Sequence, residues 1–216
     1  APLVLTANFA SSVAIVLLNA AVFKRLHFRF TTALTAAHYL TNICGLRALA
    51  ALNVFDDRQA KTTPLTPRLR LLILVVGAAP ALHNLSLKLN DVGFYQVVKL
   101  LVNPTTVLLE WALYRKSLSL ERALALIMIC VGVGIASVND VSVHASGLLA
   151  ALVWVPVATT YKVLWSREAK EGEWNSMALM TRVLPLSTVV TALLVPLIDP
   201  PGLLEYKWNG LRAAAA

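Results

Sequence analysis

The chain is divided into apolar runs, each of which is long enough to cross a bilayer as a single helix. Backbone polar groups in lipid must be hydrogen-bonded within the segment or the fold, so runs of this length predict helices. We therefore expect an all-α fold, a polytopic transmembrane helical bundle that forms one domain over residues 1–216. About seven helices are predicted, at residues 2–22, 31–54, 70–88, 92–114, 119–138, 146–165 and 176–198.

The composition supports a membrane protein. Of the 216 residues, 58% are hydrophobic and 14% are charged, whereas soluble domains carry about 25% charged residues. The net charge is +8, but most Lys and Arg lie in short connections between apolar runs, where such residues set membrane topology. Because no basic amphipathic helix is present, the charge does not predict binding to nucleic acid. The lipid bilayer is the predicted partner.

The sequence contains no motif that predicts an enzyme. Cys44 and Cys130 each lie inside an apolar run, with no spacing that suggests a disulfide framework or a metal site. Gly132 and Gly134 are not a phosphate loop, because no strand precedes them and no Lys-Ser/Thr follows, so we expect them to favour close helix packing. We therefore predict no catalytic activity, no cofactor and no metal.

The run at residues 92–114 carries a lysine, Lys99, near its middle. A cation at membrane depth is costly unless it faces protein, water or an anion. Gln96, Lys99 and Asn103 are spaced three and four residues apart and so share one face of a helix, which Tyr95 flanks. This face predicts a substrate site for an anion such as a phosphate, with Lys99 as its point-charge partner.

Other interpretations of the polar residues remain open. Lys99 would also be satisfied by a carboxylate on another helix, or by extending its ammonium to the membrane surface. Arg182, about two turns into the last run, is either a second anion contact or the partner of an acidic group. Glu110 is nearer a helix end, and we expect it to pair with Arg115 or to cap a loop. For Lys162, near the end of its run, extension of the ammonium to the membrane surface is one interpretation.

The third run holds His83 and Asn84. A single histidine is most often a satisfied structural group, and this is the interpretation that we favour for His83. The Asn84 amide is suited to a hydrogen bond between helices. In the next run, Pro104 leaves a backbone carbonyl without its usual donor and predicts a kink.

Four segments together carry a resemblance. The most specific is Asn84-Leu-Ser-Leu-Lys-Leu-Asn-Asp-Val-Gly-Phe-Tyr-Gln-Val-Val-Lys99, which runs on to Pro104. The others are Asn19 with Phe30-Thr-Thr-Ala-Leu-Thr-Ala-Ala-His38, then Val131-Gly-Val-Gly-Ile-Ala-Ser137 followed by Asp140 and Gly147, and lastly Asn175-Ser-Met-Ala-Leu-Met. In order and spacing, over nearly the whole chain, they resemble the triose-phosphate translocator and nucleotide-sugar transporter family of the drug/metabolite transporter superfamily.

The resemblance implies ten helices in two inverted repeats of five, so that residues 1–138 would form the first repeat and 146–216 the start of the second. The chain would then be truncated after seven of ten helices. The family implies an antiporter that exchanges a phosphorylated sugar, triose phosphate or nucleotide sugar for phosphate or a nucleoside monophosphate by alternating access. Lys99 falls on the family's substrate-phosphate lysine, and Asn84 falls next to the site. The family implies a Golgi or endoplasmic reticulum membrane, or the plastid envelope; a homodimer is also possible.

The sequence also departs from the family pattern. Ala20 stands where the family usually has a lysine, and Thr181 and Arg182 stand where a Tyr-Tyr or Tyr-Asn pair often follows. The ninth helix, which supplies further basic contacts in the family, would be absent. These departures favour an alternative from another class: a truncated membrane protein that does not transport and acts as a partner or regulator of other transporters.

Overall fold

The computed structural model describes residues 2–90, 92–116, 118–139 and 145–203, which contain helices and no strand. All seven predicted helices are present, so the all-α prediction is confirmed. The eight helices in the described residues are α1 (Pro2–Lys24), α2 (Thr31–Ala51), α3 (Arg58–Thr62), α4 (Pro67–Leu89), α5 (Val92–Tyr114), α6 (Leu120–Asn139), α7 (Ala145–Glu171) and α8 (Ser176–Ile198).

Several of these helices are suited to a bilayer. Within the described residues, four segments are long and apolar enough to cross a membrane, by length and composition: Leu5–Phe23, Pro67–Leu89, Ala145–Glu171 and Ser176–Ile198. Many of the large apolar side chains on the outer faces of the bundle are exposed, as lipid-facing positions are. The fold is a helical membrane bundle.

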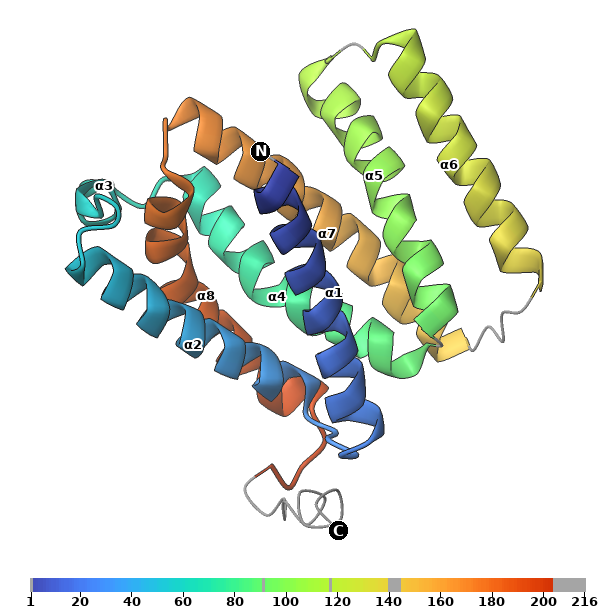
Figure 1. Ribbon diagram of the computed structural model, residues 1–216, viewed down its shortest axis with the longest axis horizontal. Coiled ribbons are helices and arrows are strands. Elements are labelled where there is room, and N and C mark those ends of the chain that lie inside the picture. Colours follow the sequence, from blue (N-terminus) through green and yellow to red (C-terminus); the bar gives the residue numbers. More distant parts are fainter. Residues whose placement is uncertain (1, 91, 117, 140–144, 204–216) are drawn as a thin grey trace.

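Helix α4 is the centre of the bundle. It packs against α2, α5, α7 and α8, and Figure 1 shows α8 and α2 on one side of it, with α7, α5 and α6 on the other. One apolar core joins α2, α4, α7 and α8 around Leu72 and Leu179. A second joins α4, α5 and α7 around Tyr95 and Trp154. The second core forms the floor of the candidate site described below.

The ends of α4 and α8 follow from local sequence. The Thr66 hydroxyl accepts a hydrogen bond of 3.2 Å from the Leu69 amide, and Pro67 occupies the first turn, where its missing N–H costs nothing. Asn175 caps α8 in the same way, by accepting a hydrogen bond of 2.9 Å from the Met177 amide. These caps explain why α4 starts three residues before the predicted start at residue 70.

Helix α3 was not predicted. It has five residues and lies in the connection between α2 and α4. Ala60 is buried against the first core, and the Gln59 amide donates a hydrogen bond of 2.7 Å to the Gly172 carbonyl beyond the end of α7. A helix this short is unstable on its own, so these tertiary contacts stabilise it.

Of the two glycines predicted to favour close packing on α6, Gly134 lies outside the residues whose surroundings the structure describes, and Gly132 makes no close contact with a described residue. A Cβ atom added at Gly132 would meet no described atom within 4 Å, and α6 packs mainly on α5. Gly77 on α4 is instead the glycine of a close helix contact: an added Cβ would lie 2.7 Å from Val190 Cβ and 2.9 Å from the Ser187 carbonyl of α8. This contact allows α4 and α8 to approach closely.

Candidate functional site: a cationic cavity between three helices

A cavity of about 190 Å³ lies where α4, α5 and α7 meet. It contains two lysines, Lys99 from α5 and Lys162 from α7, and neither Asp nor Glu is among the residues that the structure places on its walls. The lining residues are Ala79, Pro80, His83, Lys99, Val102, Trp154, Ala158, Tyr161 and Lys162. The described lining is therefore cationic, on a largely apolar and aromatic background.

Within the described part of the chain, Lys99 is a charge of this cavity without a partner. Its side chain is exposed and makes neither a hydrogen bond nor an ion pair with any residue that the structure describes. The carboxylate that the sequence left open as a partner for Lys99 is not found among these residues. Its ammonium is close enough to His83 and Lys162 to interact electrostatically with both. An ammonium in these surroundings is available to an anion.

Lys162 is the functional candidate that the sequence did not identify. Its Nζ donates a hydrogen bond of 3.2 Å to Asn103 Oδ1 on α5, one turn after Lys99. The sequence placed Lys162 near the end of its run, but α7 does not end at residue 165 and continues to Glu171. The extension is stabilised by a 2.8 Å ion pair between Arg167 and Glu171, and the longer helix leaves Lys162 well inside it. Sequence spacing held no signal of this pairing, because it depends on α5 and α7 lying side by side.

Three aromatic rings support the cavity. The ring centroids of His83 and Tyr95 are 5.0 Å apart, and those of His83 and Trp154 are 5.2 Å apart. Tyr95 stacks on Trp154 at 5.7 Å, and its buried hydroxyl has no described hydrogen-bond partner. Tyr95 therefore lies behind the site and fixes Trp154 and His83. His83 lines the same cavity as Lys99, a proximity that the sequence did not predict.

Two other predicted site residues, Asn84 and Gln96, are not among the described residues that line the cavity. The Asn84 amide is buried and donates a hydrogen bond of 2.9 Å to the Thr35 hydroxyl of α2. This is the predicted kind of bond between helices, and it points away from Lys99. The Gln96 side chain lies outside the described residues.

The structure does not bring Arg182 together with Lys99. Its Nη2 donates a hydrogen bond of 2.8 Å to the Thr63 carbonyl after α3. The acceptor is a backbone carbonyl in the connection after α3, and Arg182 forms no ion pair with a carboxylate in the part of the chain that the structure describes. Its role as an anion contact stays a prediction. Glu110 is also paired differently from the prediction: it forms a 2.6 Å ion pair with Lys116.

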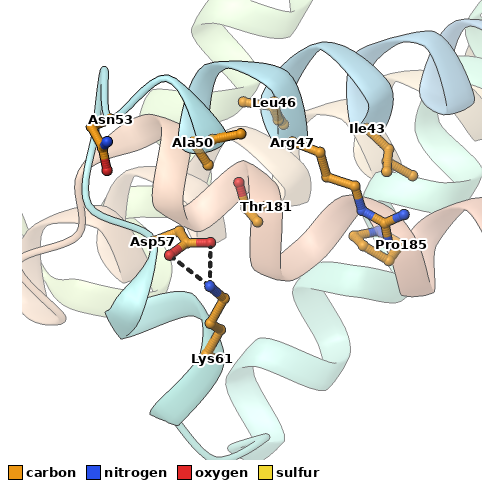
Figure 2. Close-up of a pocket in the computed structure, with 10 residues that line it drawn as sticks. Ile43, Leu46, Arg47, Ala50, Asn53, Asp57, Lys61, Thr181 and Pro185 are labelled. Carbon is orange, nitrogen blue, oxygen red and sulfur yellow. Dashed lines mark hydrogen bonds and ion pairs between the residues drawn. The ribbon is translucent and has the colours of Figure 1, made fainter.

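A larger cavity, of about 610 Å³, lies between α2, α3 and α8 (Figure 2). Its charged residues are Arg47, Asp57 and Lys61. Figure 2 shows the Lys61 ammonium directed at the Asp57 carboxylate, in an ion pair of 2.8 Å. This pair cancels two of the three charges, so the cavity is less suited to a multiply charged anion than the one at Lys99.

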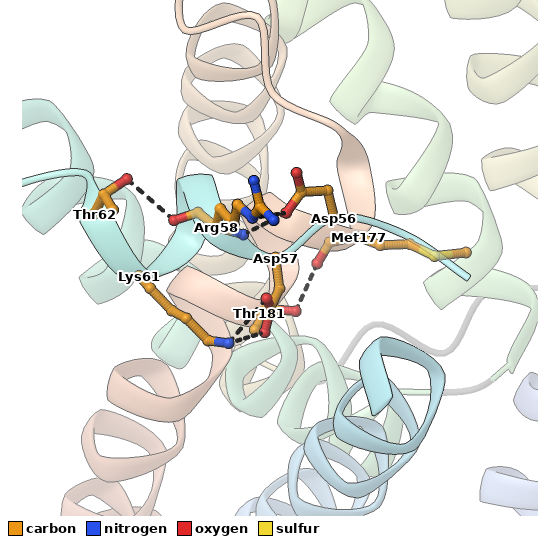
Figure 3. Close-up of polar contacts among 7 residues, drawn as sticks. All are labelled: Asp56, Asp57, Arg58, Lys61, Thr62, Met177 and Thr181. Atoms are coloured by element: carbon orange, nitrogen blue, oxygen red, sulfur yellow. Dashed lines mark hydrogen bonds and ion pairs between the residues drawn. The ribbon is translucent and has the colours of Figure 1, made fainter. Parts of the chain in front are cut away.

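The polar groups around this larger cavity are also satisfied by one another. Figure 3 shows the Thr181 hydroxyl donating a hydrogen bond of 2.8 Å to the Met177 carbonyl. The Asp56 carboxylate accepts a hydrogen bond of 2.9 Å from the Arg58 amide. The first contact lies within α8, and the second lies at the start of α3, next to the cavity.

The fold and the cationic cavity agree with a comparison of the whole sequence. A family model described as the Triose-phosphate Transporter family matches residues 2–199. The chain belongs to this family. It is therefore an integral membrane protein of a transporter family, as the residues around Lys99 predicted.

Individual relatives are transporters of Arabidopsis thaliana. The chain is 36% identical to nucleotide-sugar uncharacterized transporter 2 over 96% of its own length and 52% of that protein. It is 33% identical to UDP-xylose transporter 1 over 89% of its length and 55% of that protein. It is 31% identical to UDP-rhamnose/UDP-galactose transporter 2, again over 89% and 55%. The chain thus spans about half the length of these relatives, and no solved structure matches it.

Proposed function

We propose that this chain carries the anion site of a nucleotide-sugar transporter, with Lys99 as the contact for a substrate phosphate. The observation that carries the proposal is the position of Lys99: it lines a cavity between three helices, its described surroundings supply no counter-charge, and no described group accepts its hydrogen bonds. An uncompensated ammonium is expensive if the cavity lies within the bilayer. A phosphate would supply both the missing charge and the missing acceptors.

The substrate is a nucleotide sugar, exchanged for a nucleoside monophosphate or phosphate. The names of the relatives support this choice, since they are transporters of nucleotide sugars. The walls of the cavity support it as well. Trp154 and Tyr161 are aromatic surfaces beside the two lysines, and a nucleotide sugar needs both apolar surface for its rings and cations for its phosphates. The family is one of transporters, and we propose no catalytic step.

Alternating access would expose this site to each side of the membrane in turn. In the proposed arrangement, residues 1–138 form one five-helix repeat and residues 146–216 begin the second, so that Lys99 and Lys162 lie on opposite repeats. Rocking of the repeats would then change the distance between the two lysines. The site residues proposed are Lys99 and Asn103 on the cavity face, Tyr95 behind it, and Gln96 on the same helix. We further propose a Golgi or endoplasmic reticulum location, with the plastid envelope as the alternative.

The test is exchange of a radiolabelled UDP-sugar in proteoliposomes that contain the full-length protein. Lys99→Ala should abolish exchange, because it removes the cation that the substrate phosphate contacts. Lys88→Ala is the matched control: Lys88 lies on neighbouring α4, its ammonium donates a hydrogen bond of 3.0 Å to the Arg29 carbonyl, and it is not on the cavity wall. Exchange that survives Lys99→Ala would overturn the proposed site.

A wild-type protein that inserts correctly but exchanges no UDP-sugar, UMP or phosphate would instead favour the alternative of a non-transporting partner or regulator.

A localisation experiment with a fluorescent fusion tests the proposed compartment. Colocalisation with a Golgi or endoplasmic reticulum marker is expected, and a signal confined to plastids would favour the alternative.

A further inference from the structure

Two lysines share one cavity although like charges repel. Lys99 comes from α5 and Lys162 from α7, and the two ammonium groups interact electrostatically. No described carboxylate lies on the cavity wall to offset them. Both side chains are exposed, so neither is confined there by burial. A pair of cations that converges on one cavity is suited to a ligand that carries more than one negative charge.

The hydrogen bond to Asn103 explains how Lys162 is directed into the cavity. Asn103 is four residues after Lys99 on α5, so the two side chains lie on the same face of the helix. Its Oδ1 accepts the 3.2 Å hydrogen bond from Lys162 Nζ. A neutral amide oxygen is a weaker acceptor for an ammonium than a phosphate oxygen is. This hydrogen bond holds Lys162 next to the helix face that carries Lys99.

We propose that Lys162 is a specificity residue that contacts a second phosphate, so that the site prefers a diphosphate to a monophosphate. This inference rests on the proposed function, in which Lys99 contacts the first phosphate. The ligand class is a nucleoside diphosphate or its sugar ester, whose two adjacent phosphates match one cation from α5 and one from α7. Binding replaces the Lys162–Asn103 hydrogen bond with a charge-assisted bond to the second phosphate and so joins the two helices through the ligand.

The test compares the affinities of purified full-length protein for UDP and UMP, measured by competition against a labelled nucleotide. Lys162→Ala should weaken UDP binding about ten-fold or more, because it removes a charged hydrogen bond. It should change UMP binding by less than about two-fold, so the preference for UDP collapses. Lys162→Gln keeps most of the side-chain volume and should give the same loss, which separates the charge from packing.

Lys170→Ala is the matched control. Lys170 is an exposed lysine two turns further along the same helix, outside the cavity wall, and its removal should leave both affinities unchanged. The unfolding temperature of each variant in detergent, without nucleotide, verifies that the fold is intact.

Failure of this inference is distinguishable from failure of the proposed function. If Lys99→Ala abolishes binding of both nucleotides but Lys162→Ala weakens UDP and UMP equally, or weakens neither, Lys162 is not a second-phosphate contact. If Lys99→Ala leaves both affinities unchanged, or the wild-type protein binds neither nucleotide, the proposed function itself is wrong, and the assignment of Lys162 fails with it.

Discussion

The Lys162 ammonium on α7 donates a hydrogen bond of 3.2 Å to Asn103 Oδ1 on α5. The two bonded residues are 59 positions apart in the sequence. The bond holds a second cation near Lys99. In the proposed arrangement it also joins the two repeats of the transporter. A ligand that takes Lys162 away from Asn103 would therefore act on the contact between the moving parts.

Changing Asn103 tests this relationship directly. Asn103→Asp places a carboxylate within hydrogen-bond distance of Lys162 and one turn from Lys99 on α5, where it would compete with the substrate phosphates for the lysines. We expect UDP affinity to fall about ten-fold or more, whereas Asn103→Ala, which removes only a neutral acceptor, should lower it by less. Competition binding on the purified protein measures both. A carboxylate variant that binds UDP as tightly as Asn103→Ala does would contradict the cationic site.

The helices could be predicted because the features that determine them, apolar runs of membrane length, lie within each segment of the sequence. Each apolar run of membrane length is a helix in the structure, and the polar face around Lys99 follows from spacing on one helix. Helix α3 was missed because its five residues, Arg58–Thr62, have no apolar period and depend on burial of Ala60 and on the contact of Gln59 with Gly172. These contacts come from distant parts of the chain.

The candidate site was predicted only in part, for the same reason. Lys99 is identified by its own helix, but Lys162 becomes a candidate only when α7 extends past residue 165 and packs against α5. Arg182 was predicted to be either an anion contact or the partner of an acidic group, because an arginine within an apolar run is costly. The structure provides a different solution, the Thr63 carbonyl, which no pattern within the α8 run contains.

The larger cavity between α2, α3 and α8 provides a negative prediction. Arg47→Ala and Lys61→Ala should each leave UDP affinity within about two-fold of the wild type, because neither residue lines the Lys99 cavity. In addition, the 2.8 Å pair with Asp57 already neutralises the Lys61 charge. The same competition assay applies, with Lys99→Ala as the positive control. A large loss of affinity in either variant would move the anion site to this end of the bundle.

Gly77 provides a prediction about packing. Gly77→Leu should markedly lower the unfolding temperature in detergent, because even its Cβ would lie 2.7 Å from Val190 Cβ and 2.9 Å from the Ser187 carbonyl. Overpacking of a close contact typically costs about 1–3 kcal/mol. Gly45→Leu, on α2, is the control, since an added Cβ there would meet no described atom within 4 Å. Equal unfolding temperatures for the two variants would contradict the close approach of α4 and α8.

Asp199 provides a prediction about the junction of α8 with α2. Its carboxylate accepts hydrogen bonds of 3.0 Å and 2.8 Å from the Thr32 and Ala33 amides, and so caps α2 from the end of α8. Because capping by a carboxylate also complements the helix dipole, Asp199→Ala should destabilise the protein by about 1–2 kcal/mol. Asp199→Asn, which keeps one acceptor oxygen, should cost less.

Thermal unfolding of the purified protein in detergent measures both Asp199 variants against Glu173→Ala, a change at an exposed carboxylate in the connection between α7 and α8. The expected order of unfolding temperatures is wild type and Glu173→Ala together, then Asp199→Asn, then Asp199→Ala. Because Asp199 is far from Lys99 in the sequence and does not line its cavity, nucleotide affinity at a temperature where all variants are folded should not change. An Asp199→Ala protein as stable as the Glu173→Ala control would show that the cap does not hold α2 against α8.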